Sequence, residues 1–291
     1  MIQFNKSTKG MKKLHFWGEL LNLLDTQMTE PTIYGWFHLL FISITIAATI
    51  VMCQYFKNPS EKTTRKILFV FAAISIVLEV YKQINYTFTY DGNKIITDYQ
   101  WYAFPFQFCS TPMYVALLAS FVKQTKLHNA LCAYLATFSV FAGLCVYTYP
   151  EQVFIGTIGI NIQTMVCHGA MIVVGIWLLY CNYIKSEHKT ILYATPVFAV
   201  MIILAMIMNE VANQSGLLTR ESFNMFYISP YCEPSLPVYS IVQKVVPYPF
   251  CLLIYLLAFS IAAYIILLIS IFLKKHPDKN KVLEKEAVLT K

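Results

Sequence analysis

The sequence predicts an all-α membrane protein, a bundle of seven transmembrane helices with its N-terminus outside the cell and its C-terminus in the cytoplasm. Of its 291 residues, 57% are hydrophobic and only 13% are charged, and the mean hydropathy is +0.56. A soluble domain carries about 25% charged residues. Long apolar runs recur along the chain, and lysines gather in alternate connecting segments. These features are typical of a multi-pass protein of the cell membrane.

Residues 1–30 precede the first apolar run and form the first predicted unit. Within them, residues 11–25 place apolar side chains at helical spacing, which predicts an amphipathic helix lying on the membrane surface. Pro31 ends this segment. The membrane domain is predicted at 31–275, and the lysine-rich residues 276–291 are predicted to form a solvated basic tail in the cytoplasm.

Seven apolar runs within the membrane domain are separated by polar segments. A helix needs about 20 residues to cross the roughly 30 Å of membrane hydrocarbon, and each run reaches that length. The predicted spans are 33–55, 66–88, 102–122, 127–148, 159–184, 190–211 and 245–273.

The distribution of lysine and arginine predicts the orientation. Segments 56–66, 123–126 and 185–189 are rich in these residues, whereas 89–101 contains only Lys94 and 149–158 contains none. The positive-inside rule places the rich segments in the cytoplasm. With seven spans, this orientation puts the N-terminus outside.

The third run begins with an unusual stretch, WYAFPFQFCSTPMY at residues 101–114. Pro105 and Pro112 flank Cys109, and a proline within a spanning helix frees a backbone carbonyl and bends the chain. Polar residues at this depth are costly and indicate function unless they are paired. The alternative is that Cys109 is a small packing residue, as most membrane cysteines are.

Polar side chains from several predicted spans fall in the outer half of the membrane. The cytoplasmic halves, such as 116–122, 172–179 and 254–273, are nearly free of them. This separation predicts a polar cavity that opens to the extracytoplasmic side. The predicted lining residues are His38, Glu79, Lys82, Gln107, Cys109, Thr111, Asn161, Thr164, His168, Asn209 and Asn213.

Cys109 and His168 are the candidate catalytic residues. They lie about 10 Å and about 15 Å below the outer ends of their spans, at 1.5 Å per residue. An imidazole can take the proton of a thiol, and the thiolate can then attack an acyl carbonyl. A packing or hydrogen-bonding role for His168 remains the alternative. Glu79 and Lys82, one turn apart, are either a structural salt bridge or part of an ion or proton path.

Metal binding is the weaker interpretation of these polar residues. His38, Glu79, Cys109 and His168 could supply ligands, but the chain has no short-spaced ligand motif. The sequence therefore predicts neither a metal nor a cofactor. The net charge of +7 is concentrated in short loops and the tail, so it does not indicate nucleic-acid binding.

Three stretches carry a resemblance to a known family: FPFQFCSTPMY at 104–114, NIQTMVCHGAMI at 161–172 and MNEVAN at 208–213. Within a seven-span plan over roughly 30–275, they resemble the YwaF-like bacterial integral membrane proteins. These are distantly similar to an animal glycerophospholipid acyltransferase with a Cys/His pair and to the androgen-induced lipid hydrolases with a Thr/His pair. The resemblance implies Cys109 as nucleophile and His168 as base. The family commonly has histidine where this chain has Gln107.

Two functional classes are consistent with these observations. The first is an acyltransferase or hydrolase that acts on a membrane lipid, either a phospholipid or an acyl donor, through Cys109 and His168. The second is a transporter or receptor that holds a small polar ligand in the same cavity, as the Glu79 and Lys82 pair suggests.

Overall fold

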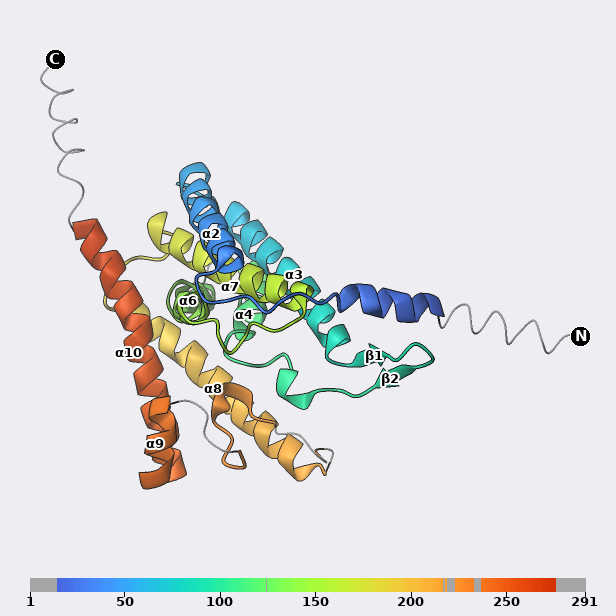
Figure 1. The fold of residues 1–291 in the computed structure, drawn as a ribbon. Helices are drawn as coiled ribbons and strands as arrows, with labels where there is room; N and C mark the ends of the chain where they lie inside the picture. Colours follow the sequence, from blue (N-terminus) through green and yellow to red (C-terminus); the bar gives the residue numbers. More distant parts are fainter. Residues whose placement is uncertain (1–14, 124, 217, 219–222, 233–236, 276–291) are drawn as a thin grey trace, which may run out of the picture.

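The computed structural model describes residues 15–123, 125–216, 218, 223–232 and 237–275. The predicted tail at 276–291 and the first residues of the predicted N-terminal helix lie outside the described residues. The described part is helical apart from one small β-hairpin and its connecting loops (Figure 1).

Within the described residues, six helices are long and apolar enough to cross a membrane. Three of them are α2 (Trp36–Tyr55), α3 (Glu61–Asn85) and α7 (Ile158–Tyr180), and two more are α8 (Thr190–Gln214) and α10 (Tyr248–Lys275). The remaining one runs from Lys126 to Thr148 and comprises α5 (Lys126–Tyr134), the π-helical turn η2 (Leu135–Ser139) and α6 (Val140–Thr148). A multi-pass membrane protein follows from these helices.

The predicted helix at 102–122 is corrected by the structure. Only α4 (Thr111–Phe121) is α-helical there, and its 11 residues rise about 16 Å. The short 3₁₀ turn η1 (Trp101–Ala103) precedes it, and residues 104–110 are irregular. Pro105 lacks the N–H that a helix interior needs, whereas Pro112 is tolerated because it lies in the first turn of α4.

The start of the second predicted span also differs in the structure, for a local reason. The second span was predicted from residue 66, but α3 begins at Glu61 because the hydroxyl of Ser60 accepts a hydrogen bond from the backbone N–H of Thr63 at 3.1 Å. Such an N-cap stabilises a helix start even where the sequence is polar. Pro247 separates α9 (Pro237–Val245) from α10 at the start of the last predicted span.

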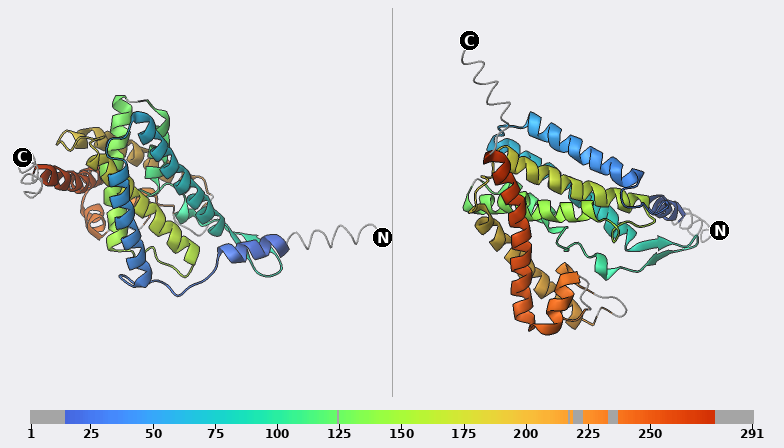
Figure 2. Two further views of the ribbon diagram at one scale, coloured as in Figure 1. Left: turned by 90° about the horizontal axis from the view of Figure 1, so that it is seen from above. Right: turned by 60° about the vertical axis from the view of Figure 1, so that its left-hand side comes forward.

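The continuous helix 126–148 and α7 form the centre of the bundle. Helices α2 and α3 pack on α7, α8 packs on α5, and α10 packs on α8 and η2 (Figures 1 and 2). Most residues in the apolar parts of the two central helices are buried, whereas few of those in α10 are. The exposed apolar faces of α2, α8 and α10 are what lipid contact requires.

One end of the bundle carries the lysine-rich segments, and we call it the basic end. Its turns are joined to one another, since Arg65 Nε donates to the carbonyl of Ser120 at 2.7 Å and Trp177 Nε1 donates to the carbonyl of Phe56 at 2.9 Å. The hydroxyl groups of Ser186 and Ser270 lie 2.8 Å apart at the same end. The structure thus brings segments 56–66, 120–123 and 181–189 together with the end of α10.

The opposite end carries the β-hairpin of β1 (Phe88–Tyr90) and β2 (Ile95–Thr97), and we call it the hairpin end. The backbone N–H groups of Lys94 and Asn93 donate to Asp91 in the hairpin turn, which lowers the pKa of its carboxyl group. Gly92 adopts a left-handed φ of 92°, which favours glycine.

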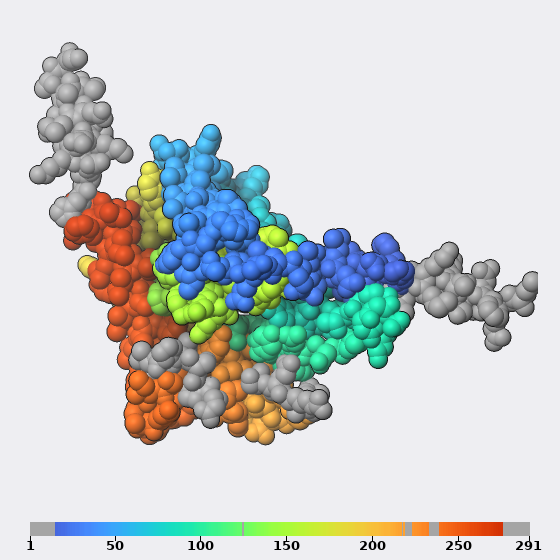
Figure 3. All heavy atoms as spheres, viewed as in Figure 1, coloured from blue at the N-terminus to red at the C-terminus, as the bar shows by residue number. Residues whose placement is uncertain are grey.

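A helix at residues 15–24 extends along the hairpin (Figure 3). Gly18 is in contact with the Tyr90 ring, where any side chain would clash, and Tyr81 donates to the carbonyl of Leu24 at 2.7 Å. Phe16 and Leu23 remain exposed. The helix itself was predicted, and its position on a membrane surface stays a prediction.

Candidate functional site

A cavity of about 820 Å³ lies between α3, the irregular segment 104–110, α6, α7 and α10, and it reaches the hairpin end. This volume is typical of a small-molecule site. The cavity brings together some of the predicted site residues from three segments of the chain. They are Glu79, Lys82, Gln107, Cys109, Thr164 and His168.

The irregular segment places Cys109 on the cavity wall. The backbone N–H of Ser110 donates to the carbonyl of Gln107 at 2.8 Å, which closes a turn around Cys109 before α4 begins. The hydroxyl of Thr111 donates to the carbonyl of Phe108 at 2.8 Å. Non-helical backbone at membrane depth is tolerated where protein groups satisfy it in this way.

Gln107 connects this segment to a second irregular stretch, the 223–229 loop between α8 and α9. Its Nε2 donates to the carbonyl of Asn224 at 3.0 Å, and its Oε1 accepts from the N–H of Phe226 at 2.9 Å. Phe226 is fully buried and has a φ of 60°. Gln107 therefore holds a buried, strained loop in place while it also lines the cavity.

His168 is buried on α7, and its two ring nitrogens differ. Nδ1 lies 2.7 Å from the carbonyl oxygen of Thr164, and because a carbonyl can only accept, Nδ1 carries the hydrogen. Nε2 has no hydrogen-bond partner among the described residues. In the neutral ring, Nε2 then holds a lone pair that is not used by the protein, which is the form that a general base needs.

The glycine after His168 is required by packing. A β-carbon on Gly169 would lie 2.4 Å from the Tyr147 hydroxyl oxygen and 2.6 Å from Thr45 Oγ1. The Tyr147 hydroxyl donates to the carbonyl of Met165 at 2.7 Å. This contact fixes the turn of α7 that carries His168 against α2 and α6.

Three thiols line the cavity among the described residues: Cys109, Cys145 and Cys167. Cys167 was not predicted as a site residue, although it stands beside His168 in the sequence. Gln163 Nε2 lies 3.8 Å from its sulfur atom. The sequence signal for Cys167 was its place next to the candidate base, on a helix already predicted to face the cavity.

Glu79 and Lys82 form an ion pair on the cavity wall. Lys82 Nζ lies 2.9 Å from Glu79 Oε1, and both side chains are largely buried. Gln83 Nε2 donates to the same carboxylate oxygen at 2.8 Å and to the carbonyl of Ala103 at 2.8 Å. The pair therefore belongs to a network that also anchors the start of the irregular segment.

The described cavity and bundle lie within the region that defines the family. The TMEM164 family model matches residues 33–269, which span α2 to most of α10. The chain belongs to the TMEM164 family. Neither a curated protein nor a solved structure matches it. All residues that line the cavity fall within the matched region.

Two of the predicted lining residues lie away from the TMEM164 cavity, at the hairpin end. His38 Nδ1 accepts from the backbone N–H of Tyr34 at 3.0 Å, and its Nε2 lies 3.0 Å from the carbonyl oxygen of Tyr147. Asn161 Oδ1 accepts from the N–H of Ile155 at 2.9 Å, and its Nδ2 donates to the carbonyl of the same residue at 2.6 Å. Both side chains are fully buried and hold loops in place.

Three other predicted lining residues also form hydrogen bonds with backbone groups or neighbouring side chains. Asn209 bonds to both the N–H and the carbonyl of Met225, at 2.7 and 3.0 Å. Asn213 Nδ2 donates to the carbonyl of Asn209 at 2.8 Å. Thr111 shares a 2.7 Å hydrogen bond with the Tyr134 hydroxyl. The polar residues predicted from membrane depth thus divide between the cavity wall and supports for loops.

A second cysteine–histidine pair lies near the basic end. Cys132 Sγ is 3.5 Å from His128 Nε2, and both residues are fully buried. His128 Nδ1 donates to the carbonyl of Ala119 at 3.0 Å, and Nε2 accepts from the Tyr183 hydroxyl at 2.7 Å. Neither residue is part of the cavity wall. The i, i+4 spacing of His128 and Cys132 on one helix is a signal that the sequence analysis missed.

No group of three or more His, Cys, Asp or Glu side chains that could hold a metal ion occurs in the part of the chain that the structure describes. The groups on the cavity wall that the proposed chemistry uses are its thiols, the His168 imidazole and the Glu79–Lys82 ion pair.

Proposed function

We propose that this TMEM164-family protein is a lipid-directed acyltransferase or hydrolase that uses a cavity thiol as nucleophile and His168 as base. The observation that carries the proposal is the buried Nε2 of His168, which has no partner among the described residues, in a cavity that also holds Cys109 and Cys167. A buried polar atom without a protein partner costs free energy unless a ligand or substrate pairs with it.

The proposed reaction has two balanced steps. Nε2 of His168 takes the thiol proton, the sulfur attacks the acyl carbonyl of a lipid ester, and the ester C–O bond breaks. The proton passes from His168 to the leaving lysolipid oxygen, and an acyl thioester remains on the cysteine. In the second step His168 takes a proton from a lysolipid hydroxyl or from water, whose oxygen attacks the thioester, and the proton returns to the sulfur.

The cavity walls suit a lipid ester. Phe108, Phe141 and Phe259 supply apolar surface, and Glu79 and Lys82 supply the polar groups. The volume of about 820 Å³ has room for a head group and part of an acyl chain. The resemblance to YwaF-like proteins, and through them to a Cys/His glycerophospholipid acyltransferase, supports Cys109 as the nucleophile.

The test is a search for the thioester. Protein is purified with its native lipid, incubated with a phospholipid that carries a labelled acyl chain, and digested for mass spectrometry. We expect the label on Cys109 and its loss in Cys109→Ser, with the fold retained because sulfur and oxygen differ little in size. Cys132→Ser is the matched control, since this thiol lies outside the cavity, and it should leave labelling unchanged.

Label on Cys167 rather than Cys109 would reassign the nucleophile within the same cavity. To cover fast deacylation, lipid turnover is measured in parallel. Full turnover in a variant with Cys109, Cys145 and Cys167 all changed to Ser would overturn the enzyme proposal.

A second candidate function is favoured by one observation, the ion pair on the cavity wall. Buried charges in a membrane often mark ion or proton paths, and Glu79 and Lys82 could hold a small polar ligand. On this alternative the protein is a transporter or receptor, and the lipid profile of the membrane would not change when the protein is removed.

We also propose seven crossings of the cell membrane, with the basic end in the cytoplasm and the N-terminus outside. The crossing that is not one of the six long helices is formed by residues 101–121, the third crossing in chain order. These residues run beside α3. Gln83 bonds to Ala103 near one end of α3, and Arg65 bonds to Ser120 near the other. A tag inserted after Gly216 should be accessible in intact cells and a tag at 57–60 shielded. A shielded tag after Gly216 would refute this orientation.

A further inference from the structure

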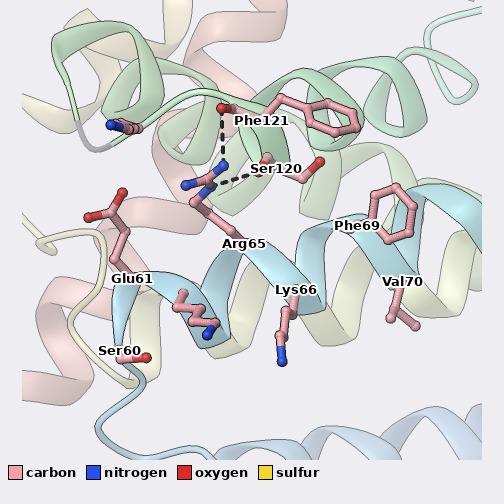
Figure 4. Close-up of a pocket in the computed structure, with 10 residues that line it drawn as sticks. Ser60, Glu61, Arg65, Lys66, Phe69, Val70, Ser120 and Phe121 are labelled. Atoms are coloured by element: carbon pink, nitrogen blue, oxygen red, sulfur yellow. Dashed lines mark hydrogen bonds between the residues drawn. The ribbon is translucent and has the colours of Figure 1, made fainter.

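A second hollow, the basic groove, lies at the basic end between the start of α3 and the end of α4 (Figure 4). Its volume is about 960 Å³, and it is separate from the cavity described above. The groove is lined by Ser60, Glu61, Lys62, Arg65, Lys66, Phe69, Val70, Ser120, Phe121 and Lys123.

The lining of the basic groove carries an excess of positive charge. Lys62, Arg65, Lys66 and Lys123 are cationic and Glu61 is the one carboxylate in this lining, which gives a net formal charge of +3. The three lysines are exposed, so their ammonium groups are free to turn toward a ligand. An anion is the ligand that this charge favours.

Arg65 gives the charged part of the groove a fixed frame. Its Nε donates to the carbonyl of Ser120 at 2.7 Å and its Nη2 to the carbonyl of Phe121 at 3.1 Å (Figure 4). These bonds tie the end of α4 to the first turns of α3. They also hold a permanent positive charge at the base of the groove, because a guanidinium stays protonated.

An apolar wall continues from the charged part along the helices. Phe69, Val70 and Phe121 are all exposed, and the rings of Phe69 and Phe121 meet edge to face at 6.0 Å. Since α3 is one of the helices long and apolar enough to cross a membrane, we expect this wall to face the lipid chains just inside the interface. Charge at the interface with apolar surface beside it matches a phosphate linked to an acyl chain.

We propose that the basic groove binds an anionic glycerophospholipid of the leaflet at this end. The phosphate head group is held by Lys62, Lys66 and Lys123 around the fixed charge of Arg65, and an acyl chain lies along Phe69 and Phe121. Basic pockets between transmembrane helices are known to bind anionic lipid head groups. Through Arg65, the bound lipid stabilises the contact between α3 and α4. It thereby stabilises the proposed crossing at residues 101–121, in which only α4 is α-helical.

The experiment measures lipid binding to the full chain in mild detergent by native mass spectrometry. The probes are phosphatidylglycerol, phosphatidylcholine and deacylated glycerophosphoglycerol. The test variant is Lys62→Gln with Lys123→Gln, and the matched control is Lys185→Gln with Lys189→Gln. All four lysines are exposed at the basic end, but only the first two line the groove.

We expect the native chain to bind phosphatidylglycerol more tightly than phosphatidylcholine. Each groove lysine removed should weaken phosphatidylglycerol binding about fivefold, so the test variant should lose about 25-fold. The control variant should stay within about twofold. The deacylated head group should not compete at equal concentration, because it lacks the chain that the apolar wall holds.

Three results would overturn the proposal: an equal loss in both double variants, equal binding of the two lipids, or full competition by the deacylated head group. The last result would indicate a site for free phosphate esters instead. None of these measurements involves the cavity thiols, so failure here would leave the acyl-transfer proposal untouched, and failure there would leave this one untouched.

Discussion

Two regions of the described structure place a cysteine thiol and a histidine imidazole in the same surroundings. They differ in what surrounds the imidazole. In the packed pair, Cys132 Sγ lies 3.5 Å from His128 Nε2, but that nitrogen already accepts from Tyr183. In the cavity, His168 Nε2 has no partner among the described residues, and the thiols of Cys109 and Cys167 line the same space.

On the proposed function, proximity alone is not the property that makes such a pair reactive. A base needs a lone pair that the fold does not use, and a substrate needs room to reach the thiol. The packed pair has its sulfur within 3.5 Å of the ring nitrogen but lacks both. We therefore regard it as structural and the cavity pair as the candidate for catalysis.

The largest expected effect comes from removing each imidazole in turn. His168→Ala should lower lipid turnover by about 10²–10⁴-fold, the usual contribution of a general base, with a small change in thermal stability. His128→Ala should instead destabilise the fold, by about 1–3 kcal/mol for each of the two partners left without a hydrogen bond. Turnover per folded molecule should remain near the native value.

The measurement is lipid turnover normalised to folded protein, together with thermal unfolding of both variants. A loss of turnover in His128→Ala equal to that in His168→Ala would mean that the packed pair also takes part in catalysis, and the comparison would fail.

The fold could be predicted in outline because hydrophobicity over about 20 residues is a strong signal. Six of the seven predicted runs correspond to the six long helices in the described residues. The run at 102–122 is α-helical only at Thr111–Phe121, although Pro105 and Pro112 were visible in the sequence. Mean hydropathy does not distinguish a helix from an apolar segment whose backbone is held by distant groups, such as Gln107 and the 223–229 loop.

The site could be predicted only in part, for a similar reason. Of the side chains selected by membrane depth, Glu79, Lys82, Gln107, Cys109, Thr164 and His168 line one cavity. Depth cannot say whether a polar side chain faces a cavity or a loop. His38, Asn161 and Asn209 bond to backbone groups of segments far away in the sequence or in loops whose path the sequence does not reveal.

Glu79 and Lys82 combine the properties of the two histidines. Each has a partner within the protein, as His128 has, and both line the cavity, as His168 does. Glu79→Gln or Lys82→Met alone should destabilise the fold by about 3–5 kcal/mol, since each leaves a buried charge without its partner. The double variant should be more stable than either single variant.

Turnover of the double variant then separates the two roles. If the pair only supports the segment that carries Cys109, the folded double variant should keep lipid turnover. If it binds the substrate head group or a small polar ligand, turnover or ligand binding should be lost in well-folded protein. Normal function in the double variant would exclude a direct role for either residue.

The smallest expected effect tests the comparison at the packed pair itself. Tyr183→Phe removes the hydroxyl that donates to His128 Nε2 and changes little else, so the lone pair of Nε2 is then left facing the Cys132 thiol at 3.5 Å. The loss of this hydrogen bond should cost about 0.5–1.5 kcal/mol in unfolding free energy. Labelling of Cys132 by a lipid-soluble electrophile should nevertheless stay slow, because the thiol is fully buried away from the cavity. In the same sample Cys109 should react faster than Cys132. Should Tyr183→Phe make Cys132 react as fast as Cys109, a neighbouring ring lone pair alone would be sufficient to make a thiol reactive. Access through the cavity would then not be required.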